Sequence, residues 1–106
     1  MNDKSEFNRV HAIQHPKATE AHISKALNDR QEYVRAAAIQ HPNVTPEHID
    51  KALNDKEGQV RARAIEHPKA TDAHFEKALN DEKEYIRGIA QRLRSDRRKK
   101  EQPQSQ

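Results

Sequence analysis

A period of 26 residues constrains the fold of this chain more than any other feature. The dipeptide His-Pro recurs at 15–16, 41–42 and 67–68, and the segment Lys-Ala-Leu-Asn-Asp recurs at 25–29, 51–55 and 77–81. Residues 3–14 align with residues 29–40 and form an earlier half-unit. Fixed periods of roughly 20–50 residues are typical of solenoids and arrays, because each unit needs its neighbours to bury its apolar face.

Each unit is predicted to form two short helices. Thr19 and its copies suit the N-cap of the first helix, and Asp29 with Glu32 has the spacing of a capping box that would start the second. Pro42 disfavours helical backbone at the residue before it, so the second helix should end near Gln40. The expected helices cover residues 4–14, 20–28, 30–40, 46–54, 56–66, 72–80 and 82–94.

The inward face of the second helix is predicted from apolar residues at helical spacing. Val34 and Ala38 form this stripe, and Tyr33 and Ala37 extend it. All four aromatic residues are interpreted as core residues of the repeat: Phe7, Tyr33, Phe75 and Tyr85.

The two ends of the array are more polar than its middle. In the first half-unit Asn8 stands where Val34 stands in the next unit, and in the last unit Gln91 stands where Ile39 does. Terminal units of a solenoid need a polar outer face, so these exchanges predict a small array with both ends capped.

An aspartate followed six residues later by an arginine recurs in the three units, and this pattern resembles the second helix of HEAT-like repeats. The 26-residue unit with its His-Pro also resembles the leucine-rich repeat variant. The resemblance covers residues 3 to about 92. It implies an all-α fold, a right-handed α-solenoid of about three and a half helical hairpins.

Residues six apart on a helix lie about 240° apart around its axis, so the side chains of Asp29 and Arg35 should not pair within one unit. The resemblance implies instead that each arginine bridges to an aspartate of a neighbouring unit. The resulting structural ladder comprises Asp29, Arg35, Asp55, Arg61, Asp81 and Arg87. A phosphate-binding or catalytic role for these arginines is the alternative.

The chain divides into a repeat domain and a basic tail. Residues 1–92 form the domain, with the half-unit 3–14 and the units 15–40, 41–66 and 67–92; residues 93–106 are predicted to be a disordered tail. Basic tails contact phosphates or acidic protein surfaces, although a merely solubilising end is equally consistent. The candidate contact residues are Arg94, Arg97, Arg98, Lys99 and Lys100.

Candidate catalytic or metal-binding chemistry is sparse. The seven histidines fall mostly on equivalent positions of the units, about 10 Å apart in packed helices, which is too far to share one zinc ion. Structural hydrogen bonds explain them best, with a pH-sensitive surface and a metal site as alternatives. The chain has no glycine-rich loop and no cysteine. We therefore expect no enzyme, no metal and no cofactor.

Positions that vary between units are candidates for recognition, because the repeat itself does not need them. Gly58 and Gln59 replace Glu32 and Tyr33, and Arg63 replaces Ala37. Gly58, Gln59 and Arg63 are accordingly candidate partner-binding residues; neutral variation at tolerant positions is the alternative.

Composition alone points toward disorder, and it is the repeat that indicates a folded domain, whose lack of catalytic chemistry favours a binding function. Hydrophobic residues make up only 32% of the chain, and the 35% of charged residues are nearly balanced, with a net charge of +3. No apolar run could cross a membrane or serve as a signal peptide, so the expected location is the cytoplasm. The predicted function is a protein-binding adaptor or inhibitor, a monomer or weak dimer that docks on a larger protein. The second hypothesis is electrostatic nucleic-acid binding through the basic tail.

Overall fold

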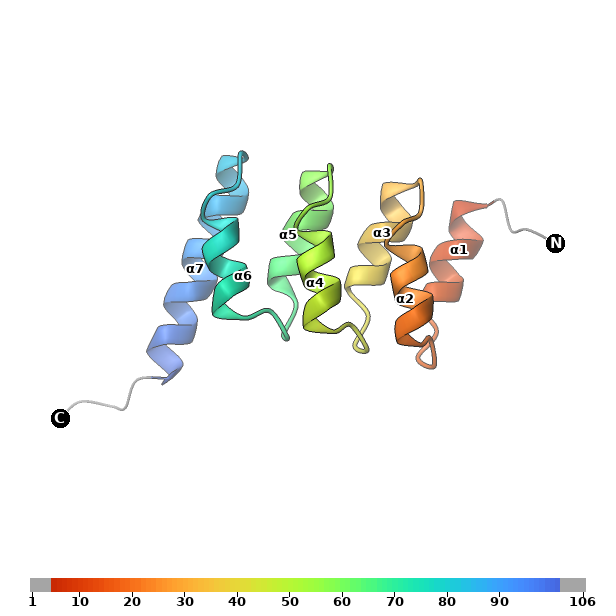
Figure 1. The fold of residues 1–106 in the computed structure, drawn as a ribbon, viewed down its shortest axis with the longest axis horizontal. Coiled ribbons are helices and arrows are strands. Elements are labelled where there is room, and N and C mark those ends of the chain that lie inside the picture. The colour runs from red at the N-terminus through yellow and green to blue at the C-terminus, as the bar shows by residue number, and fades with distance from the viewer. Residues whose placement is uncertain (1–4, 102–106) are drawn as a thin grey trace.

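Seven α-helices joined by short turns, with no strand, make up the described part of the computed structural model, residues 5–101 (Figure 1). The predicted all-α class is therefore confirmed. The helices are α1 (Glu6–Ile13), α2 (Glu20–Ala26), α3 (Glu32–Ile39), α4 (Pro46–Ala52), α5 (Gly58–Glu66), α6 (Asp72–Ala78) and α7 (Glu84–Glu101).

The helices lie in two layers. Helices α1, α3, α5 and α7 pack side by side in one layer, each against the next, while α2, α4 and α6 cover the other side (Figure 1). Each helix of the second layer packs mainly on the odd-numbered helix that follows it in the chain. The N-terminal and C-terminal helices therefore lie at opposite ends of a row, and one face of the odd-numbered layer remains uncovered by other helices.

The first helix of each hairpin begins at the predicted threonine. The hydroxyl group of Thr19 accepts a hydrogen bond from the backbone N–H of His22, and the imidazole of His22 accepts one from the backbone N–H of Thr19. The same reciprocal cap occurs at Thr45 and Thr71. Histidine here takes the part that glutamate or glutamine takes in the usual capping box.

The second helix of each hairpin begins two residues later than predicted. Asp29 is not its N-cap, because its carboxylate accepts a hydrogen bond from the backbone N–H of Gln31 at 2.9 Å and folds residues 29–31 into a turn. Gln31 is the N-cap, without a side-chain hydrogen bond, and Glu32 is the first helical residue. The predicted capping box at Asp29 is wrong.

The core is built from one stripe of aliphatic residues on each helix. Ile23, Ile49 and Val34 are fully buried, and alanines such as Ala38 and Ala64 let neighbouring helices approach closely. Phe75 is buried, as predicted, but Phe7, Tyr33 and Tyr85 are exposed by 76%, 59% and 53%. Their assignment to the core is therefore wrong: at one residue before the buried Val34, Tyr33 lies on the solvent side of its helix.

Helix α7 crosses the predicted domain boundary at residue 92 and continues to Glu101. Residues 93–101 are therefore helical, contrary to the predicted disorder, and residues 102–106 lie outside the described residues. The reason is spacing: Leu93 and Arg97 fall on the same helical face as Ile86 and Ala90, which are buried. This stripe keeps the helix attached to α6.

The extension of α7 replaces contacts that a following unit makes elsewhere. The carboxylate of Asp50 pairs with His74 of the next unit at 2.7 Å. Glu76 occupies the position of Asp50 in the last unit, and its partner is Arg94, at 3.2 Å. Asn43 donates to the carbonyl of Ala18, and Arg97 donates to the carbonyl of Ala70 at 2.7 Å. Residues 93–101 are thus a terminal cap for the last hairpin.

Candidate functional site

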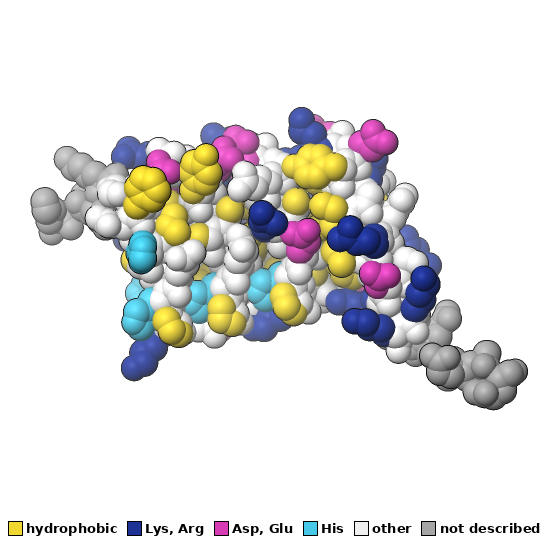
Figure 2. Space-filling view, turned by 180° about the vertical axis from the view of Figure 1, so that it is seen from behind, with side chains coloured by type: hydrophobic (Ala, Val, Ile, Leu, Met, Phe, Trp, Pro, Cys, Tyr) yellow, Lys and Arg dark blue, Asp and Glu magenta, His cyan; other side chains and the backbone are white. Residues whose placement is uncertain are grey.

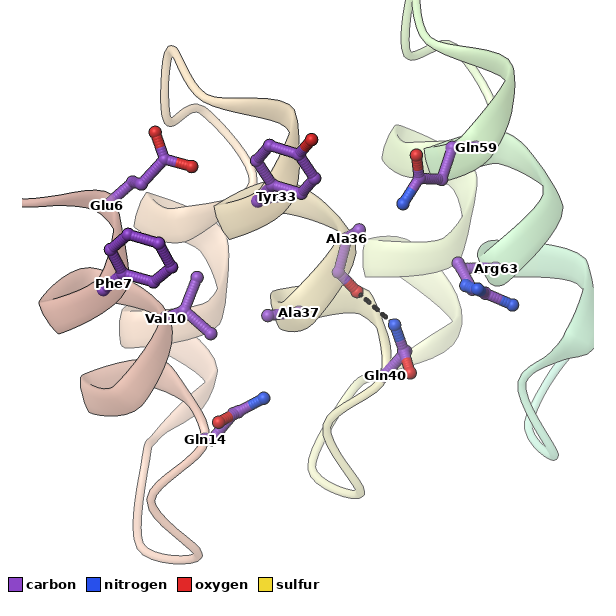
Figure 3. Close-up of a pocket in the computed structure, with 10 residues that line it drawn as sticks. All are labelled: Glu6, Phe7, Val10, Gln14, Tyr33, Ala36, Ala37, Gln40, Gln59 and Arg63. Carbon is purple, nitrogen blue, oxygen red and sulfur yellow. Dashed lines mark hydrogen bonds between the residues drawn. The ribbon is translucent and has the colours of Figure 1, made fainter.

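A groove crosses the uncovered face of α1, α3 and α5 (Figure 3). Its volume is about 550 Å³. Val10 and Ala37 form part of an apolar floor between α1 and α3. Gln59 points toward this floor from α5, and Arg63 lines the groove one turn further along the same helix. We call this feature the aromatic groove, lined by Glu6, Phe7, Val10, Gln14, Tyr33, Ala36, Ala37, Gln40, Gln59 and Arg63.

Two aromatic rings stand at one edge of the aromatic groove. Phe7 projects from α1 and Tyr33 from α3, and their rings lie near one another above the apolar floor (Figure 3). Both side chains are more than half exposed. The space-filling view of this face shows hydrophobic side chains along its upper part, from the α1 end toward the α7 end (Figure 2). Exposed aromatic residues around a depression are typical of interaction surfaces.

The three candidate partner-binding residues separate into two roles. Gln59 and Arg63 line the aromatic groove, and Arg63 also pairs with Glu66 at 3.3 Å on the surface. Gly58 does not line it. A Cβ atom at Gly58 would lie 2.6 Å from the hydroxyl oxygen of Tyr85, so the glycine allows that tyrosine to lie close to the start of α5. Sequence reasoning did not find Phe7 and Tyr33 as surface residues, because both were assigned to the core.

The arginine and aspartate side chains form equivalent ion pairs between hairpins. Nε of Arg35 donates to one carboxylate oxygen of Asp55 at 2.7 Å, and its Nη2 donates to the other at 3.2 Å. Its Nη1 donates to the backbone carbonyl of Asp29 at 2.8 Å. Arg35 therefore binds the backbone of its own unit and the carboxylate of the next. Arg61 repeats all three bonds with Asp55 and Asp81.

The ladder begins earlier than predicted and ends without a carboxylate. Arg9 pairs with Asp29 at 2.8 Å; its position 26 residues before Arg35 is the signal that could have identified it. Arg87 donates through Nη1 to the carbonyl of Asp81 at 2.6 Å. Among residues 5–100, however, no carboxylate pairs with the rest of its guanidinium.

Hydrogen bonds stabilise the ionised form of Asp29 and Asp81 in the ladder. Burial disfavours the charged form of Asp29, but the hydrogen bonds from Arg9 and from the backbone of Gln31 outweigh it and lower the pKa of the carboxyl group. Asp81 follows the same pattern, with bonds from Arg61 and the backbone of Lys83 lowering its pKa. The bond to Asp81 in turn raises the pKa of Arg61. These groups are ionised structural partners.

The histidines of the His-Pro segments are structural as well. The backbone N–H of Asn43 donates to Nδ1 of His41 at 2.9 Å, and Nε2 of His41 lies 2.8 Å from the carbonyl oxygen of His15. His67 makes the equivalent bonds, to Lys69 and His41. Within the described residues no three His, Asp or Glu side chains are grouped so that they could hold a metal ion.

Among the described residues, the basic candidate contact residues on α7 fall into a paired and an unpaired group. Arg94 and Arg97 belong to the terminal cap, where Arg97 also lies 3.5 Å from Asp72. Arg98, Lys99 and Lys100 are exposed and form no ion pair with another described side chain. Lys and Arg side chains gather at the α7 end of the molecule (Figure 2).

Comparison with known proteins gives no relative from which to transfer a function. No family model matches the chain, and no curated protein and no solved structure matches it either. Across residues 5–101, no helix has the length and apolar character needed to span a membrane.

Proposed function

We propose that this chain is a right-handed α-solenoid of about three and a half HEAT-like repeats and acts as a non-catalytic protein-binding module, a small adaptor or inhibitor. The architecture is supported by the inter-hairpin bonds that recur along the chain, such as Arg35 to Asp55 and Arg61 to Asp81. Every buried polar side-chain atom of the described residues has a hydrogen-bond partner, which leaves recognition to the exposed face.

The aromatic groove is the observation that supports this function. Its floor is apolar, its edge carries Phe7 and Tyr33, and its other side carries Gln59 and Arg63. Tyrosine and arginine are enriched among the residues that contribute most binding energy at protein interfaces. Tyrosine in particular buries a large area at a small entropic cost. A segment of a larger protein could bury its apolar side chains here and satisfy its polar groups on the glutamine amides.

Substitution of the groove residues tests this function. The double variant Phe7→Ser, Tyr33→Ser should lose the protein partner that wild-type chain captures from nuclease-treated extract. Tyr85→Ser is the matched control, because Tyr85 is an exposed aromatic residue outside the groove. Helical content of each variant should stay unchanged by circular dichroism. Equal capture by wild type and the double variant would contradict the proposal.

Electrostatic nucleic-acid binding is the second candidate, and the exposed basic residues on α7 favour it. Its test must spare the terminal cap, so Arg98, Lys99 and Lys100 are changed to glutamine while Arg94 and Arg97 are kept. If this function operates, the triple variant loses binding to single-stranded and duplex probes, and wild-type affinity falls steeply with salt. Binding that is absent at low salt, or unchanged in the variant, excludes it.

A further inference from the structure

Arg87 stands where the ion-pair ladder stops. Its Nη1 bonds to the backbone carbonyl of Asp81 as Arg61 bonds to that of Asp55, so its guanidinium is anchored in the same way as those of the preceding units. The anchored group is half-buried. The edge formed by Nε and Nη2 holds a carboxylate in each preceding unit, but at Arg87 no described side chain occupies it.

The preceding units show which ligand this edge accepts. In each of them the two nitrogens grip one aspartate carboxylate side-on, at 2.7–2.8 Å from Nε and 3.1–3.2 Å from Nη2. In each case the aspartate lies in the turn just before a helix. Two parallel hydrogen bonds to one planar carboxylate are the geometry that arginine favours.

The terminal cap leaves this position open. Residues 93–101 supply Arg94 to Glu76 and Arg97 to the carbonyl of Ala70, and so complete the other contacts at the end of the last hairpin. Residues 93–100 supply no partner to Arg87. Beside it, Gly88 occupies the place of the buried Ala36 and Ala62, and a Cβ atom there would meet nothing within 4 Å. Among the described residues, therefore, nothing fills the space next to Arg87 that a following unit would occupy.

We propose that Arg87 is a binding site for an aspartate carboxylate of an acidic protein segment, held side-on by Nε and Nη2. Arg98, three turns further along α7 on the same face, adds attraction for an acidic segment. The ligand is a carboxylate because that is the group the equivalent arginines hold.

A second copy of this chain fits the position less well. Stacked on α7, its α1 would occupy the position that α3 occupies against α1, and Asn8 would take the place of Val34 and Val60. Those valines are buried, whereas Asn8 is polar and exposed. Burying its amide without a partner is unfavourable, so a different protein is the expected source of the aspartate.

The test uses ¹⁵N-labelled wild-type protein and the Nε–H resonances of its arginines. The probe is a blocked peptide with the sequence of residues 78–85, which carries Asp81 and the turn that Arg61 binds. We expect a saturable shift of the Arg87 resonance, with no change at Arg35 and Arg61, whose edges are occupied. The exposed Arg92 is the control for non-specific binding.

Two further probes decide the chemistry of the ligand. The same peptide with Asp81→Asn must not shift Arg87, and an oligothymidylate of eight nucleotides represents a phosphate ligand. The proposal is overturned if the aspartate peptide leaves Arg87 unshifted at concentrations that begin to shift Arg92. It is also overturned if the asparagine peptide acts equally, or if only the oligothymidylate shifts Arg87.

Discussion

The guanidinium carbon of Arg97 lies 4.7 Å from the centre of the Phe75 ring. Phe75 is a buried residue of α6, and within the described residues no helix beyond α7 covers it, so a charged residue of the α7 extension does so. The same guanidinium donates to the carbonyl of Ala70. The side chain of Arg97 thus covers the ring of Phe75 and also satisfies the backbone carbonyl of Ala70 at the α7 end of the molecule.

Arg97→Ala should destabilise the protein by about 1–2 kcal/mol, because it removes a cation–π contact and a hydrogen bond to a buried carbonyl. Arg98→Ala, which removes an exposed neighbour on the same helix, should change the free energy of unfolding by less than about 0.5 kcal/mol. Urea unfolding followed by circular dichroism measures both. Equal stability of the two variants would show that residues 93–101 do not cap the last hairpin.

Asp81→Asn should cost about 3 kcal/mol, because it leaves the buried guanidinium of Arg61 without its counter-charge. Both side chains of this pair are only 8% exposed. Glu82→Gln is the control, since Glu82 is 78% exposed and lies 3.9 Å from the same arginine. The difference between the two variants in thermal unfolding measures the inter-hairpin pair against a surface contact.

Stability should fall in acid through the aspartates of the ladder. The ordinary aspartate pKa is about 3.9, and the pKa values of Asp29 and Asp81 are lower in the folded protein. Each group therefore contributes its stability in full above the unfolded-state pKa and loses it as the pH falls through the folded-state pKa. Unfolding free energies measured from pH 6 down to about pH 2 should decline over the lower part of this range. In Asp81→Asn the decline should be shallower, and an identical slope would contradict the assignment.

His41 should be present as the tautomer with its proton on Nε2. A backbone N–H can only donate to Nδ1, and a backbone carbonyl can only accept from Nε2, so the two bonds together fix the ring. The ¹⁵N shifts of the imidazole at neutral pH distinguish the tautomers. The exposed His11 should show averaged values, whereas a proton on Nδ1 of His41 would contradict the geometry.

The sequence predicted the number and type of helices because the repeat presents each signal several times. The threonine caps, the prolines and the aliphatic stripes all point to the same seven helices. The start of the second helix in each hairpin was wrong, since the spacing of Asp29 and Glu32 fits a capping box as well as it fits the turn that forms. Local spacing alone does not distinguish these two arrangements.

The aromatic groove could not be predicted in the same way. Tyr33 is apolar enough to belong to a core stripe, and only the direction in which α3 packs on α1 and α5 places it on the solvent side. The helical end of the chain was missed for a different reason. Its basic composition is typical of a tail, and the packing of Arg97 depends on Phe75 and Ala70, which lie 22 and 27 residues earlier.

Because Arg94 and Arg97 fasten the extension of α7 onto the last hairpin, a new hairpin is accommodated most simply between existing ones. A 26-residue duplication between residues 41 and 66 would add one hairpin with its own arginine and aspartate, and both ends would stay as they are. Units appended after residue 101 would instead have to displace the extension of α7 from Glu76 and Ala70.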